Sequence, residues 1–119
     1  MENIHSLIEQ IVSDISMQAA RLDDIRRQMF LEWLMSHSST MKTVVCSDRQ
    51  AEVRNHFDGA VYGPDRDAKG LGIGLKAWFA SLPVQGLLWE YYLILDEIAW
   101  WRDLDRASLA RILKSKIRD

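Results

Sequence analysis

Hydrophobic residues are most concentrated between Leu87 and Trp101, where the sequence reads LLWEYYLILDEIAWW. They do not alternate with polar residues as in a half-exposed strand, and the run is long enough for about four helical turns. Because a helix that is apolar on nearly all sides belongs inside a bundle or an interface, we predict a central helix here. Glu90 and Glu97 share nearly one face of that helix, and we expect this face to meet solvent or a basic partner.

A second pattern covers residues 4–34, where apolar residues are spaced alternately four and three apart, as in a coiled-coil seam. The seam consists of Ile4, Ile8, Ile11, Ile15, Gln18, Leu22, Ile25 and Met29. It predicts one long amphipathic helix, or two nearly collinear helices that meet near Ser16. The apolar face either packs on the protein's own core or forms a helical interface with another chain, whose register Gln18 would set.

The middle of the chain is less regular. Residues 43–46 have the composition of a short strand, and a capping-box pattern at residues 47–50 predicts a helix that ends at Gly59. Five of the chain's six glycines lie within residues 59–74, which predicts a connector. A further helix is predicted over residues 75–81.

The chain ends in a predicted helix over residues 105–118. Asp105 has the position of an N-cap, and Leu104 and Leu109 have the spacing of a hydrophobic staple. The elements together predict an all-α fold, a compact bundle of roughly four to five helices around the central apolar helix, in a single domain. The alternative is an α+β fold in which residues 43–46 and 60–62 form a small two-stranded hairpin.

Composition narrows the class of protein. A chain of 119 residues with 48% hydrophobic and 27% charged residues fits one globular domain with a core of its own. The single cysteine, Cys46, excludes an internal disulfide and a cysteine-rich zinc site, and fits a reducing cytosol. The first residues lack the pattern of a signal peptide, and acids interrupt the apolar run, so we expect a cytoplasmic protein without a membrane span.

Charge is distributed unevenly although the formal net charge is only −2. Residues 77–101 contain three acids and no base, whereas residues 102–119 contain six bases and three acids. A basic C-terminal helix therefore follows an acidic central one.

The motifs that would carry enzymatic chemistry are incomplete. The glycines of residues 70–76 lack the spacing of a Walker loop or a dinucleotide fingerprint, and a calcium loop over residues 65–76 would place lysines where ligands belong. No two histidines have the spacing of a helical metal site, and Cys46 would act as a nucleophile only if folding brought a base such as His56 beside it. We therefore predict no enzyme, no cofactor and no metal.

Tryptophan is the most suggestive residue type, with five in the chain. Trp100 and Trp101 are adjacent, so on a helix they point about 100° apart, and we expect one of them in a surface patch. Trp and Arg are favoured anchors of protein interfaces. The predicted partner-binding residues are Trp101, Arg102, Arg106, Arg111 and Lys114.

The leading functional prediction is a non-enzymatic protein–protein interaction module, such as an inhibitor, an adaptor or a regulatory subunit. Its partner is another protein or a second copy of the chain, which would form a homodimer through the first helix. The alternative is a nucleic-acid-binding regulator that uses the basic C-terminal helix to contact phosphates.

Overall fold

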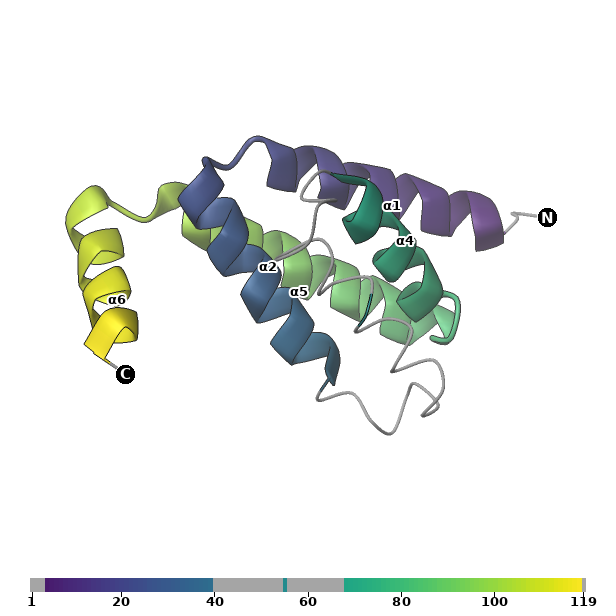
Figure 1. The fold of residues 1–119 in the computed structure, drawn as a ribbon. Coiled ribbons are helices and arrows are strands. Elements are labelled where there is room, and N and C mark those ends of the chain that lie inside the picture. The colour runs from purple at the N-terminus through teal and green to yellow at the C-terminus, as the bar shows by residue number, and fades with distance from the viewer. Residues whose placement is uncertain (1–3, 40–54, 56–67, 119) are drawn as a thin grey trace.

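The computed structural model describes residues 4–39, 55 and 68–118 (Figure 1). Five helices and no strand lie in these ranges. The helices are α1 (Ile4–Ala20), α2 (Asp24–Ser39), α4 (Ala68–Phe79), α5 (Val84–Asp103) and α6 (Arg106–Arg118). The predicted all-α bundle is confirmed. The hairpin alternative, Cys46 and, apart from the helical Asn55, the capping-box helix lie outside the described residues.

Helix α5 is the centre of the bundle, as predicted. It packs against α1 and α2, and α1 in turn packs against α4 (Figure 1). The helix begins after Pro83, whose extended backbone and missing amide hydrogen suit the position just before a first turn. One side of α5 is buried along its whole length, at Leu87, Ile94, Ile98 and Trp101.

Residues 4–34 do not form one long helix or two collinear ones. Helix α1 ends at Ala20, and α2 starts at Asp24 and turns back beneath α1 (Figure 1). The break lies beyond Ser16 because Asp23 caps α2: its Oδ1 accepts a hydrogen bond from the backbone N–H of Arg26 at 2.9 Å. This bond and the ion pair with Arg26 keep the pKa of Asp23 below its ordinary value.

Most of the coiled-coil seam packs inside the chain. Ile8, Ile11, Ile15, Leu22 and Met29 belong to the buried core, whereas Ile4 and Ile25 are exposed. Of the two interpretations, the structure therefore shows an amphipathic helix on its own core. Any interface of α1 with another chain would have to use a different face of the helix.

The predicted connector over residues 59–74 is wrong at its C-terminal end, because Gly70, Gly72 and Gly74 lie within α4. Leu71, Leu75 and Trp78 recur at helical spacing and are buried, and this burial outweighs the low helix propensity of glycine. A Cβ at Gly72 would lie 3.8 Å from Cγ1 of Val12, which is ordinary van der Waals contact between α4 and α1.

Helix α6 forms one end of the molecule (Figure 1). Its N-cap is Asp105, as predicted, whose Oδ1 accepts a hydrogen bond from the backbone N–H of Ser108 at 2.7 Å. Leu109 is buried and Leu104 packs against the same core. Lys116 reaches Glu32 of α2 at 3.2 Å, which holds α6 on the α2 side of the bundle.

No helix in the described ranges is long and apolar enough to span a membrane.

Candidate functional site

The adjacent tryptophans Trp100 and Trp101 have opposite environments. Trp101 is 6% exposed because it shares a face with Ile94 and Ile98, whereas Trp100 is 51% exposed. Their rings meet edge to face, with centroids 4.8 Å apart. The expectation that one of the pair lies at the surface is thus met by Trp100. Trp101, which the sequence suggested as a partner contact, occupies a core position.

The four predicted basic contacts lie where the sequence placed them, at the end of α5 and along α6. Arg102, Arg106, Arg111 and Lys114 are all exposed. Arg102 Nε lies 3.1 Å from Oδ1 of Asp103, so part of this charge is compensated locally.

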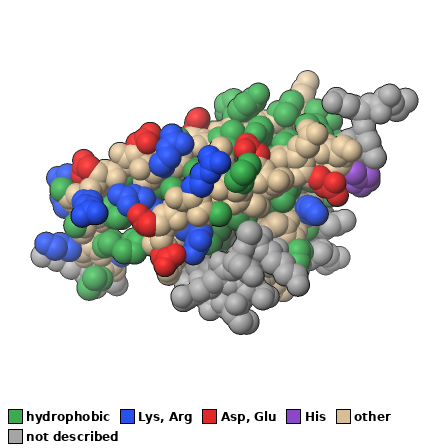
Figure 2. All heavy atoms as spheres, turned by 90° about the horizontal axis from the view of Figure 1, so that it is seen from above, with side chains coloured by type: hydrophobic (Ala, Val, Ile, Leu, Met, Phe, Trp, Pro, Cys, Tyr) green, Lys and Arg blue, Asp and Glu red, His purple; other side chains and the backbone are tan. Residues whose placement is uncertain are grey.

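Folding adds further cations to the same end of the molecule. Arg26 of α2 donates a hydrogen bond from Nη2 to the backbone oxygen of Leu104 at 2.7 Å, which ties the start of α2 to the junction of α5 and α6. Figure 2 shows Lys and Arg side chains gathered in the half of the molecule that contains this junction. The structure therefore brings the basic residues of α2 and α6 to one end.

A feature that the sequence did not single out lies on the outer face of α5. Trp89, Tyr92 and Trp100 are 65%, 60% and 51% exposed. At about 100° per residue these three side chains fall within an arc of about 80°. We call them the aromatic stripe. The stripe could not be recognised in the sequence because nearly every residue of this helix is apolar. Asp96, an exposed acid on the same face, was the residue that could have indicated it.

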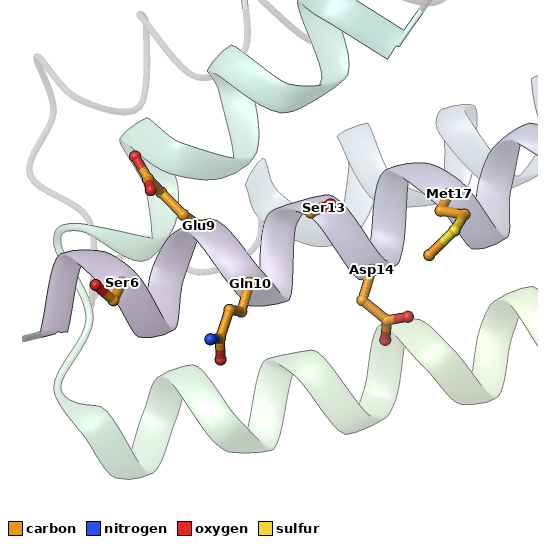
Figure 3. Close-up of a pocket in the computed structure, with 6 residues that line it drawn as sticks. All are labelled: Ser6, Glu9, Gln10, Ser13, Asp14 and Met17. Atoms are coloured by element: carbon orange, nitrogen blue, oxygen red, sulfur yellow. The ribbon is translucent and has the colours of Figure 1, made fainter. Parts of the chain in front are cut away.

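An open depression of about 440 Å³ borders this region on α1. It is lined by Ser6, Glu9, Gln10, Ser13, Asp14 and Met17. Figure 3 shows the side chains of Gln10 and Asp14 directed toward α5. There the hydroxyl of Tyr91 donates a hydrogen bond to Asp14, and the Tyr91 ring lies 5.6 Å from that of Tyr92. Contacts between side chains therefore connect the depression to the aromatic stripe.

This whole surface lacks basic side chains. Neither α1 nor residues 84–101 of α5 contain a lysine or an arginine. Asp96 is exposed on it and Asp14 is half-buried, whereas Glu9 is exposed on the side of α1 that faces away from α5 (Figure 3). The aromatic stripe is therefore set in an acidic surface, opposite in sign to the α6 end.

The hydrogen bond to Asp14, together with burial and the charge of Asp14, raises the pKa of Tyr91 from 10.0 to about 12. Because this value lies above that of the unfolded chain, protonated Tyr91 stabilises the fold below about pH 10, and the contribution is lost as the pH rises to about 12. We expect ultraviolet absorbance to show one tyrosine that ionises near pH 12. Asp14→Asn should bring it back toward about 10, and Tyr91→Phe should remove it. Simultaneous ionisation of all tyrosines near 10 in the folded protein would contradict the bond.

The acidic face of α5 that the sequence assigned to solvent or a basic partner is largely internal. Glu90 is 2% exposed, and its Oε2 lies 2.6 Å from Nε2 of His37 on α2. The solvent interpretation is wrong for Glu90, and the basic partner is a histidine of the same chain. About two turns further along α5, burial raises the pKa of Glu97, and the nearby charge of His37 opposes this shift.

Aromatic rings surround the pair of His37 and Glu90. The His37 ring stacks on Trp33, with centroids 4.9 Å apart and planes 6° apart, and meets Trp78 edge-on at 6.0 Å. The pair therefore ties α2 to α5 inside the bundle. Within the part of the chain that the structure describes, no three His, Cys, Asp or Glu side chains come together as metal ligands would.

Comparison with known proteins adds no relative. No protein family model matches the chain, and neither a curated protein nor a solved structure matches it. Functional inference therefore rests on the surface of the molecule itself.

Proposed function

We propose that the protein is a non-enzymatic protein-binding module whose contact surface is the aromatic stripe of α5. The observation that carries this proposal is the exposure of Trp89, Tyr92 and Trp100 on one face of a helix whose opposite face is in the core. Contiguous exposed apolar surface on a folded domain marks interaction sites, and Trp and Tyr are enriched at the energetically dominant positions of interfaces.

The physical reason is the cost of leaving these rings in water. Burying a large aromatic side chain stabilises a complex by about 1.5–3 kcal/mol, because apolar surface is removed from solvent. Tryptophan and tyrosine also have few rotatable bonds, so a partner that covers them loses little side-chain entropy.

A nucleic-acid-binding regulator remains the second candidate, and the exposure of Arg106, Arg111 and Lys114 on α6 favours it. Phosphate contacts need a surface of clearly positive charge. Asp103 and Asp105 lie among these cations and reduce the local charge. Protein binding is therefore the better-supported proposal.

A photo-reactive phenylalanine analogue at Tyr92 tests the proposal in the native host. We expect a covalent adduct with a protein, because Tyr92 lies within the stripe and is exposed. The matched control is the same analogue at Gln28, which is exposed on α2. Trp89→Ala combined with Trp100→Ala should abolish the adduct at Tyr92.

The outcomes separate the two candidates. An adduct that forms at Tyr92, is weak at Gln28 and survives nuclease treatment supports protein binding through the stripe. Equal adducts at both positions, or none at Tyr92, would overturn it. An adduct that disappears on nuclease treatment would favour the nucleic-acid alternative instead.

A further inference from the structure

We propose that the partner of the aromatic stripe is a second copy of this chain, which contributes the outward surface of α6. This inference rests on the proposed function, and it specifies that the protein bound by the stripe is another copy of the same chain. The outward surface consists of Ala110, Arg111, Lys114 and Ile117, and we call it the outer α6 face.

The charges of the two surfaces are complementary. The stripe lies on α5 beside α1, where residues 4–20 and 84–101 contain no lysine or arginine, where Asp96 is exposed and where Asp14 is half-buried. The outer α6 face instead presents exposed Arg111 and Lys114. Opposite potentials of this kind guide association and set the orientation of the partners.

The apolar groups are complementary as well. Ile117 is 85% exposed and lies near Ala110 and Lys114 on α6, within about 60° of arc. The small side chain of Ala110 lets another helix approach closely, and Ile117 supplies apolar surface for a ring to cover. Lys and Arg also bind favourably over the faces of Trp and Tyr rings, which the stripe offers at Trp89, Tyr92 and Trp100.

A chain does not cover its own stripe with its own α6. Leu109 is buried against the core and Lys116 pairs with Glu32 of α2, so α6 is held on the α2 side of the bundle. The stripe lies on the face of α5 that points away from that core, opposite Ile94 and Ile98. Both surfaces therefore remain open in a single copy, and contact between them has to occur between copies.

Two kinds of symmetry satisfy these contacts. Two copies can exchange both contacts about a two-fold axis, or each copy can use its stripe for one neighbour and its outer α6 face for another. Such a head-to-tail contact forms a ring if the rotation closes and an open chain if it does not. This differs from a homodimer through α1, because Ile8, Ile11 and Ile15 of its seam are already in the core.

Sedimentation velocity of the full chain over a concentration series tests the inference. We expect association at about 50 mM salt that weakens at about 500 mM, because screening reduces the attraction between the exposed charges. Arg111→Glu with Lys114→Glu should raise the dissociation constant at least about tenfold, and so should Trp89→Ala with Trp100→Ala. Lys76→Glu, which changes an exposed cation on α4, is the matched control and should assemble like the original chain.

Mixing the two double variants gives the sharpest result. Each variant retains the surface that the other has lost, so the mixture should form a one-to-one heterodimer and nothing larger, although each variant alone is a monomer. Circular dichroism confirms that each variant is folded before it is mixed.

Two results would overturn the inference: an original chain that stays monomeric at low salt, or double variants that fail to pair when mixed. If the chain is monomeric while Tyr92 still cross-links to a different protein, only the self-assembly falls and the proposed function stands. If Tyr92 also yields no adduct, both fall.

Discussion

His37→Ala is expected to lower the free energy of unfolding by about 3–5 kcal/mol, because it leaves a buried carboxylate without its partner. Glu90 is 2% exposed, and its Oε2 lies 2.6 Å from Nε2 of His37. The Glu90 side chain is only 3% exposed, so most of its surface is shielded from water that could replace the lost hydrogen bond. The ring that stacks on Trp33 is lost as well. Urea denaturation followed by far-ultraviolet circular dichroism measures the change.

Two further variants show whether the pair is responsible. Glu90→Gln keeps the shape and an oxygen that accepts the hydrogen bond from His37, so it should cost at most about 1 kcal/mol. In a Glu90→Leu background no buried carboxylate remains, and His37→Ala should then cost less than half as much. If the cost of His37→Ala is the same in both backgrounds, the carboxylate does not depend on His37, and the assignment fails.

Trp78→Ala is expected to be equally damaging, at about 3–5 kcal/mol, for a different reason. The Trp78 side chain is completely buried in α4, where its ring lies 5.2 Å from that of Phe79 and edge-on to His37. Truncation to alanine leaves a cavity that neighbouring helices fill only partly. The same denaturation experiment reports the loss.

Trp89→Ala is the matched control, since it makes the identical substitution at a tryptophan that is 65% exposed. We expect a change within about 0.5 kcal/mol, because little apolar contact is lost. Comparable destabilisation by the two variants would contradict the placement of Trp89 on the exposed face of α5. A well-folded Trp89→Ala also ensures that effects of stripe variants on association report binding and not unfolding.

Local sequence patterns were enough to predict much of the fold. The long apolar run predicts the central helix, and the structure extends it only slightly, to Val84–Asp103. Asp105 was recognisable as an N-cap because its side chain bonds to an amide three residues away. Such features depend on contacts within one or two turns, so neighbouring residues suffice to define them.

Other features depended on helices that are distant in the sequence. Gly72 lies in a helix because the apolar residues around it are buried against α1, whereas its own propensity favours a connector. The solvent side of α5 could not be recognised either. Its apolar residues point in almost every direction, so only the positions of α1 and α2 decide that Trp101 is buried and Trp100 exposed.

The candidate site likewise depends partly on local sequence and partly on contacts between distant helices. The sequence by itself determined an all-helical chain with an acidic, tryptophan-rich helix followed by a basic one. Only the tertiary structure paired Glu90 with His37 and left Trp89, Tyr92 and Trp100 uncovered. The physical reason is that helical periodicity fixes which side chains share a face, while the free energy of burial depends on which other helix packs against that face.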